Sequence, residues 1–329
     1  MTKFTVALAV LLTLGACSGD GTNPFDDDEP TDSDNTPGPE DPITATEPTE
    51  EEGGETGDGF ATGFSYDSNS DTFRVDNLAF DGDNTYERST VLPSIGPFNV
   101  YEASAQYPDD LTGSPINQLT HRAIYGISDS GSTEFAIVRT GAYVNYGFGG
   151  FVYKRNGGVE LPRSGQAGYT GQLAGIRDFD GQGGIQYTAA DIDIAIDFDD
   201  FNDATGVRGD GVQGQIYNRQ VFDEAGNDIT AAVITSINVD ESANLTAIPE
   251  ATFTIGPSVL DANGQLTGEL TSFFVNNAGQ TVQFESGNYY AIVSGSNAQE
   301  IVGVVVTTST AGQPTGVTAR ETGGFVVYR

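Results

Sequence analysis

The sequence predicts an all-β protein whose main domain is an antiparallel, eight-stranded soluble barrel, and three observations lead to the all-β prediction. The 329 residues include 43 Gly, 19 Phe and 14 Tyr, a composition typical of strands joined by tight turns. Apolar and polar residues alternate, as at residues 191–198, where three Ile and Phe198 share one face of a half-buried strand. No stretch shows a sustained apolar period of about 3.6 residues, so we expect almost no helix.

Residues 1–16 are predicted to be a lipoprotein signal peptide. Lys3 supplies a positive start, and residues 4–14 form an apolar run too short to span a hydrocarbon layer of about 30 Å. The run ends in Leu-Gly-Ala followed by Cys17, the only Cys of the chain, and so resembles the lipobox of bacterial lipoproteins. That resemblance implies cleavage before Cys17 and acylation, with chains such as palmitate, of its thiol and new N-terminus. The alternative is an ordinary secretory signal with Cys at this position by chance.

The predicted anchor places the protein at the outer membrane. Several acyl chains hold a protein stably, because each buried methylene contributes about 0.8 kcal/mol. Ser18 follows the Cys, and in enteric bacteria an Asp there favours retention in the inner membrane, so the resemblance implies outer-membrane sorting. Whether the body faces the periplasm or the exterior stays open. An exported chain without a second Cys contains no disulfide, so its core has to be large enough to stand alone.

Residues 17–59 are predicted to be the lipidated Cys followed by a disordered acidic linker. Residues 18–59 hold 15 acidic residues, no Lys or Arg, and 6 of the 14 Pro of the chain. Phe25 and Ile43 are their only large apolar residues, so the segment cannot bury enough surface to offset its ordering entropy. We expect the linker to bury nothing and to act as a tether.

Two β regions follow, a smaller sheet at residues 60–162 and the barrel domain at residues 163–329. The first region begins with a hairpin whose turn lies within residues 66–71. The chain near Leu161-Pro162 is either a domain boundary or a loop within one continuous sheet. Further hairpin turns are predicted from Gly-containing polar segments, at residues 128–131, 156–158, 180–184, 263–264 and 311–312.

Glycines recur through residues 166–179, and Gly at such short intervals relieves bending where a sheet closes tightly on itself. We therefore interpret this stretch as a curved barrel strand. Closure of the barrel pairs it with the last strand, residues 324–328, because closure removes exposed strand edges. Phe325 and Val327 are predicted to point into the barrel, which leaves Val326 on a face where Val326→Thr costs little.

Four segments of the barrel region carry a family resemblance. They are Gly-Tyr-Thr-Gly-Gln-Leu-Ala-Gly at residues 168–175, the pair at residues 194–198 and 212–216, Tyr-Tyr at residues 289–290 with residues 297–303, and the closing residues 323–329. They resemble the β-barrel domain of transferrin-binding protein B and related surface lipoproteins, which implies a soluble eight-stranded barrel on a lipid anchor. The Gly-Pro that follows the aromatic pair in that family is missing, and the body is too short for two full lobes. Transferrin binding is not implied, because the host-recognising loops have no counterpart here.

The composition excludes several functions. Lys and Arg number 13 against 47 Asp and Glu, a formal charge of −34, and phosphate binding needs clustered bases, so we expect no nucleic-acid partner. One His and one Cys cannot build a His/Cys metal site within one chain. Residues 126–130 are one Gly short of a nucleophile elbow, and the only His, His121, precedes them instead of following. We interpret His121 as structural and predict neither catalytic residues nor enzymatic activity.

Calcium is the one cofactor that the sequence leaves open. Asp67, Asn69 and Asp71 match ligand positions 1, 3 and 5 of a calcium loop, although its sixth and twelfth positions lack the usual Gly and Glu. A second acidic cluster, residues 197–203, has Phe at its fifth place. We interpret both as Asp- and Asn-rich turns beside strands, and we predict no cofactor or metal apart from this calcium candidate.

The predicted function is that of a non-enzymatic, lipid-anchored outer-membrane protein. Its barrel would bind a ligand or partner protein, for instance to capture a nutrient at the cell surface. One alternative is an integral outer-membrane barrel of the porin class, which a lipid anchor disfavours. A less favoured alternative is a secreted hydrolase, which a single His disfavours. The sequence identifies neither the ligand nor the oligomeric state.

Overall fold

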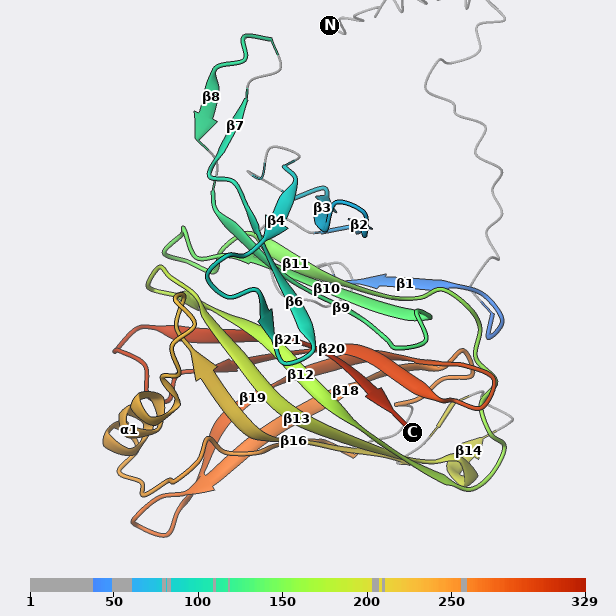
Figure 1. Cartoon of the computed structure of the whole chain (residues 1–329). Helices are drawn as coiled ribbons and strands as arrows, with labels where there is room; N and C mark the ends of the chain where they lie inside the picture. The colour runs from blue at the N-terminus through green and yellow to red at the C-terminus, as the bar shows by residue number, and fades with distance from the viewer. Residues whose placement is uncertain are drawn as a thin grey trace, which may run out of the picture. The chain divides into compact units, whose positions relative to one another are not determined.

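The computed structural model of the chain describes residues 38–48, 61–78, 81, 84–108, 111–117, 119–202, 207–208, 211–255 and 259–329 (Figure 1). The predicted signal peptide, Cys17 and the linker apart from residues 38–48 lie outside the described residues. The described chain is almost entirely antiparallel β-structure, which confirms the predicted fold class. Helical segments within it include α1 (Thr230–Asp240) and the 3₁₀ turn η2 (Phe198–Asp200). Within the described ranges, no helix combines the length and apolar composition needed to cross a bilayer.

The N-terminal region forms a nine-stranded sheet with the strand order β1-β11-β10-β9-β6-β4-β3-β2 and with β5 paired to β6. The hairpin predicted at residues 66–71 is confirmed as β2–β3, and the turn at residues 128–131 connects β9 to β10. A separate two-stranded hairpin, β7–β8, leaves this sheet (Figure 1). The strands are β1 (Ile43–Thr46), β2 (Gly63–Asp67), β3 (Thr72–Asp76), β4 (Tyr86–Arg88), β5 (Ser94–Ile95), β6 (Phe98–Ala103), β7 (Gln106–Pro108), β8 (Pro115–Asn117), β9 (His121–Ile127), β10 (Thr133–Thr140) and β11 (Gly149–Arg155).

The C-terminal region forms a closed eight-stranded barrel, as predicted. The predicted closing pair is confirmed, because β12 pairs antiparallel with β21 and places Leu173 opposite Phe325. Residues 156–158 lead the chain out of β11 towards the barrel instead of forming a hairpin. The barrel strands are β12 (Gln166–Asp180), β13 (Gln186–Asp197), β16 (Val212–Phe222), β17 (Ala251–Phe253), β18 (Gln265–Val275), β19 (Thr281–Ser294), β20 (Glu300–Ser309) and β21 (Thr318–Tyr328), with the small pair β14 (Phe201–Asn202) and β15 (Val207–Arg208) beside them.

Glycines allow β12 to lie against its neighbours, as the curved-strand interpretation requires. A Cβ on Gly175 would lie 2.6 Å from the Thr188 hydroxyl oxygen and 2.8 Å from the Thr322 carbonyl oxygen. A Cβ on Gly171 would collide with the carbonyl oxygen of Val326. Any larger residue at these two positions would therefore push β13 or β21 away from β12.

The two faces of the last strand point into two different apolar clusters. Phe325 and Val327 are fully buried inside the barrel, which confirms their predicted orientation. Val326 points outward but is only 3% exposed, because it packs into a second cluster with Ile124 and Phe135 of the N-terminal sheet. The expectation that Val326→Thr costs little is therefore wrong. The outer face of β21 is covered by another part of the chain.

The disordered-linker prediction is wrong for residues 38–48, because this segment docks on the body. Within it, β1 pairs with β11 along its whole length, and Ile43 is buried in the cluster between the N-terminal sheet and the barrel. The fully buried Arg155 donates hydrogen bonds to the carbonyl oxygens of Pro39 (3.5 Å) and Asp41 (3.0 Å). The physical reason is that β11 would otherwise expose an unpaired edge. A short strand with one apolar residue is sufficient to cover it.

Among the described residues no strand of the N-terminal sheet pairs with a barrel strand, but the two sheets share a core. Residues 37–329 form one compact unit, and β10 contacts β12, β20 and β21 of the barrel. The same guanidinium of Arg155 also donates to the barrel carbonyls of Asn263 (2.9 Å) and Val293 (2.8 Å). The chain near Leu161-Pro162 is thus a connection between two sheets, and no continuous sheet runs through it among the described residues.

Candidate functional site

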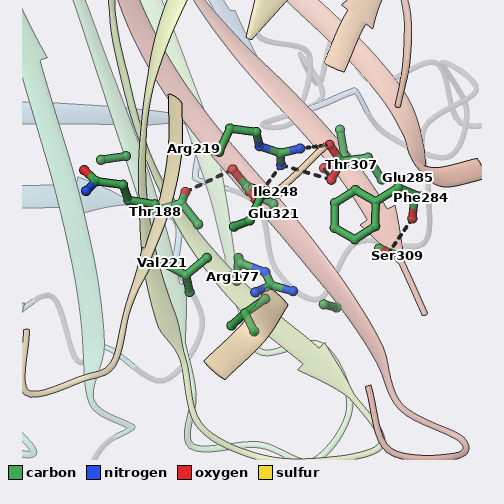
Figure 2. Close-up of a pocket in the computed structure, with 14 residues that line it drawn as sticks. Arg177, Thr188, Arg219, Val221, Ile248, Phe284, Glu285, Thr307, Ser309 and Glu321 are labelled. Atoms are coloured by element: carbon green, nitrogen blue, oxygen red, sulfur yellow. Dashed lines mark hydrogen bonds and ion pairs between the residues drawn. The ribbon is translucent and has the colours of Figure 1, made fainter. Parts of the chain in front are cut away.

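The inside of the barrel is filled by two layers of side chains. The larger layer is apolar and takes inward-facing residues from all eight strands. It includes Phe253 and Tyr289, whose rings stack with centroids 3.9 Å apart. The second layer lies towards α1 and is drawn in Figure 2. We call it the charged layer, and it consists of Arg177, Thr188, Arg219, Glu285, Thr307 and Glu321.

Arg219 of β16 is the centre of the charged layer (Figure 2). Its Nη2 lies 3.1 Å from Glu285 Oε2 and 3.2 Å from Glu321 Oε2, and its Nη1 donates to Glu285 Oε1. Burial opposes the charge of Arg219, but the attraction of the two carboxylates outweighs it and raises the pKa of Arg219. Hydroxyl groups complete the layer, since Thr188 donates to Glu321 (3.0 Å) and Thr307 to Glu285 (3.2 Å).

Arg177 of β12 adds a second positive charge to the layer. Its Nη1 donates to Gln186 Oε1 at 2.8 Å. Burial lowers the pKa of Arg177, while Glu321 and Glu285 act in the opposite direction. Two Arg and two Glu therefore balance, and the layer carries no net formal charge.

The barrel is closed on the side of the charged layer by α1 and its neighbours. Ile237 of α1, Ile248 and Phe284 belong to one apolar cluster next to the layer. The cavity that remains has a volume of about 10 Å³, which corresponds to about one water molecule. A substrate or ligand has no room there, so we assign the charged layer to the structure of the barrel.

The calcium candidates lie together in the turn between β2 and β3. The carboxylate of Asp67 accepts hydrogen bonds from the Asn69 amide nitrogen (2.9 Å) and the Ser70 hydroxyl (2.8 Å). Asp71 Oδ1 lies 2.8 Å from both Arg88 Nη2 and the Tyr101 hydroxyl, and the Arg88 guanidinium lowers the pKa of Asp71. A search of the described residues finds no group of three His, Cys, Asp or Glu side chains placed to hold a metal. Calcium binding itself stays a prediction.

His121 begins β9 and is fully buried. Its Nδ1 lies 3.2 Å from the carbonyl oxygen of Leu119, and among the described residues its Nε2 has no hydrogen-bond partner. Burial lowers the pKa of His121 to about 4. The Ser130 hydroxyl, in the turn at the opposite end of β9, donates to the carboxylate of Glu300 on β20, whose oxygens lie at 3.0 and 2.9 Å. His121 is therefore not placed to act as a base for Ser130.

The outside of the barrel has two contrasting parts. The covered wall comprises the outward side chains of β20, β21 and the second half of β12, which pack against the N-terminal sheet. Charges at this interface are paired, as in Arg320–Asp178, where Arg320 Nε lies 3.0 Å from Asp178 Oδ1. Arg139 of β10 reaches the wall too and donates to Thr322 Oγ1 at 3.0 Å.

The open wall lies on the first half of β12, the second half of β13, and on β16 and β17. It contains a hollow of about 490 Å³, and a second of about 330 Å³ adjoins it through Ala195 and Gln213. We call the two together the outer groove. Its outward-facing residues are Gln166, Gly168, Thr170, Asp193, Ala195, Asp197, Gln213, Gln215 and Thr252, with Ile255 at one edge.

The sequence contains a signal for this groove in the alternation of two of its strands. The alternation at residues 191–198 places Asp193, Ala195 and Asp197 on the outer face, opposite the three Ile. In the same way, Gln213 and Gln215 alternate with the buried Val212 and Ile216. The alternation of both segments predicts strands, and their outward positions supply most of the groove.

No protein-family profile and no curated protein matches the chain. Several solved structures do align with it. A point mutant of transferrin-binding protein B from Haemophilus parasuis Hp5 aligns over 87% of this chain and 45% of its own, with 12% identity and a TM-score of 0.38. The isotype 1 transferrin-binding protein B from serogroup B Neisseria meningitidis aligns over 69% and 36%, with 14% identity and a TM-score of 0.29. A surface lipoprotein aligns over 61% and 79%, with 14% identity and a TM-score of 0.27.

This chain spans less than half the length of the two transferrin-binding proteins that it aligns with. Likenesses of this size carry no argument about what this chain binds.

Proposed function

We propose that the chain is a non-enzymatic lipoprotein, anchored in the outer membrane through acylated Cys17, that binds its ligand on the outside of the barrel in the outer groove. One observation carries this proposal. The inside of the barrel is filled by the apolar layer and the charged layer, whereas hollows of about 490 and 330 Å³ lie on its open wall. Hollows of this size fall in the range of small-molecule sites, about 300–1,000 Å³.

The distribution of polarity favours this function over the porin-like alternative. A barrel in a lipid bilayer carries an apolar band outside and a polar interior. Here the inward residues are apolar apart from the charged layer, the covered wall packs on protein, and the open wall carries Asp and Gln side chains. That arrangement suits a barrel surrounded by water, which needs a separate anchor to stay at a membrane.

The anchor is tested with Cys17→Ser. We expect the native protein in the membrane fraction with the mass of its acyl chains, and the variant in the soluble fraction without them. Cys17→Ala should behave like Cys17→Ser, because both lack the thiol that is acylated. Unchanged fractionation of both variants, with no lipid mass on the native protein, would contradict the anchor.

The binding site is tested with a photo-crosslinking amino acid in place of Ala195, on the floor of the groove, in living cells. The matched control carries the same amino acid at Gln283, which is exposed on β19 outside the groove. We expect a crosslinked species for position 195 only, and its loss when Gln213→Ala and Gln215→Ala are added. Equal crosslinking at both positions, or none at either, would contradict a site in the groove.

A further inference from the structure

We propose that the outer groove binds an uncharged oligosaccharide, an inference that rests on the proposed function and names the ligand class of the same site. Strand register places the groove side chains in rows that cross the wall. The first row consists of Thr170, Asp193, Gln215 and Thr252, each the register partner of the next. Because neighbouring strands lie 4.7–4.9 Å apart, this row is about 14–15 Å long. The groove therefore suits an elongated ligand lying across the strands.

The next two rows form the floor and the opposite side of the groove. Gly168 pairs with Ala195, which in turn pairs with Gln213. Beyond them, Gln166 pairs with Asp197, and its Nε2 donates to Asp197 Oδ2 at 2.9 Å. Gly168 and Ala195, the small residues of the middle row, leave a depression between two polar rows. A ligand in it would contact polar side chains on both sides at once.

The amide groups of the groove are available to a ligand. Gln213 and Gln215 are exposed, and in the described part of the chain neither side-chain amide has a hydrogen-bond partner. Each amide offers two N–H donors and a carbonyl acceptor, and Thr170 offers a hydroxyl that can do both. The Thr252 hydroxyl donates to the Thr271 carbonyl oxygen (3.4 Å) and can still accept. A sugar hydroxyl likewise donates and accepts. A ligand rich in hydroxyl groups is thus the natural complement of these rows.

The charges of the groove disfavour an anionic ligand. No Lys, Arg or His is among the residues that line the two hollows, so carboxylate or sulfate groups would meet only Asp. Asp193 accepts from the Tyr217 hydroxyl and Asp197 from the Asp199 amide nitrogen (3.0 Å). Asp200 lines the smaller hollow too, and its buried Oδ2 has no hydrogen-bond partner among the described residues. Their remaining capacity is to accept further hydrogen bonds, which hydroxyl groups supply without charge.

Apolar surface in the groove fits the C–H faces of sugar rings. The floor is the methyl group of Ala195 and the Cα of Gly168. Ile255 at the edge is 49% exposed although it is a large aliphatic residue. A ligand that combines C–H faces with hydroxyl edges would cover this surface and reach the amides together.

The experiment measures binding of the purified full-length chain to two sets of oligomers of equal length by calorimetry. The first set contains uncharged gluco-, manno- and galacto-oligosaccharides, and the second contains the uronate oligomers of alginate and pectin. We expect at least one uncharged series to bind, at least tenfold more tightly than any uronate. The double variant Gln213→Ala/Gln215→Ala should lose about tenfold in affinity, because it removes both side-chain amides that would hydrogen-bond the ligand. Gln283→Ala, outside the groove, should bind like the native chain.

Three results would overturn the proposal. They are failure of every uncharged series to bind, preference for a uronate, and binding that the double variant leaves unchanged. If no sugar binds but crosslinking at position 195 still depends on Gln213 and Gln215, the groove remains the binding site and only the ligand class is wrong. If that crosslinking also fails, the proposed function fails with it.

Discussion

The covered wall and the open wall belong to the same barrel, yet they differ in the burial of their outward side chains and in the pairing of their polar groups. On the covered wall, Val302, Val304 and Val326 point outward and are buried by the N-terminal sheet, while the residues between them fill the barrel. On the open wall, the Ile and Val side chains of β13 and β16 point inward. Burial on both faces produces continuous apolar runs, and burial on one face produces alternation. The two patterns thus distinguish a packing surface from a surface left for binding.

Polar groups show the same contrast. Glu300 at the covered wall accepts hydrogen bonds from Ser130 and Thr133 of the N-terminal sheet, because a carboxylate removed from water needs partners. Gln213 and Gln215 on the open wall stay in water and keep their amides unpaired. Substitutions at the covered wall should therefore change stability, and substitutions at the open wall should change binding.

The largest effect is expected inside the barrel, which both walls enclose. Phe325 is fully buried, and Phe325→Ala removes a ring that the surrounding strands cannot replace. We expect the free energy of unfolding to fall by about 3–5 kcal/mol. Chemical denaturation followed by circular dichroism measures it. The control Val275→Ala, at a residue 60% exposed on β18, should change it by less than about 0.5 kcal/mol. Similar values for both variants would contradict a closed, filled barrel.

The sheet that covers the wall is expected to weaken in acid because of His121. Its folded pKa is about 4, against about 6.5 in the unfolded chain. Between these values unfolding takes up a proton, so the stability that this group contributes is present above pH 6.5 and lost as pH falls to 4. The loss is about 3 kcal/mol. Protonation would also leave a buried Nε2–H without an acceptor among the described residues.

Unfolding titrations from pH 8 to pH 4 on the native chain and on His121→Gln test this expectation. The difference in unfolding free energy between the two proteins should shrink by about 3 kcal/mol across this range. A difference that is independent of pH would show that His121 is protonated equally in both states.

The docked segment gives a third comparison, because sequence and structure disagree there. Ile43 is 5% exposed, and Ile43→Ala should cost about 2–4 kcal/mol. Thr44 on the same strand faces solvent, so Thr44→Ala should cost less than about 0.5 kcal/mol. Equal melting temperatures for the native chain and both variants would contradict docking of this segment and support the disordered tether that the sequence predicts.

The smallest effect compares the two walls directly with one kind of change. Val326→Thr places a hydroxyl in the apolar cluster of the covered wall and should cost about 1–3 kcal/mol. Ala195→Thr places the same hydroxyl on the open wall, where water solvates it, and should cost less than about 0.5 kcal/mol. Thermal unfolding of the two variants decides whether the walls differ as described. Equal costs would remove the distinction between them.

The groove could have been predicted in part. The alternation at residues 191–198 and 212–216 assigns Asp193, Ala195, Gln213 and Gln215 to the outer face without a structure. Their alignment into rows could not be predicted, because register between β12, β13 and β16 depends on the bulge between Ala189 and Asp191 and on barrel closure. The charged layer could not be predicted for a similar reason. Arg219 lies on β16 and Glu285 on β19, and these two strands are not neighbours in the barrel.

Helix α1 shows the limit of local patterns. Residues 230–240 are rich in Val, Ile and Thr, which favour strands, and they carry no helical apolar stripe. They form a helix because Ile237 joins the apolar cluster beside the charged layer. Tertiary packing supplies the stabilisation that the sequence of the helix lacks.

The sequence by itself determined the all-β class, the curved Gly-rich strand, its pairing with the last strand and the inward face of Phe325. These features follow from alternation and turn chemistry within short stretches of chain. Only the tertiary structure decided that Val326 is covered, that β1 docks and that the open wall stays free. Each of these depends on a distant segment, as Ser130 and Glu300 meet across 170 residues. A local pattern determines which face of a strand is apolar, but the packing of the whole chain determines which faces are removed from water.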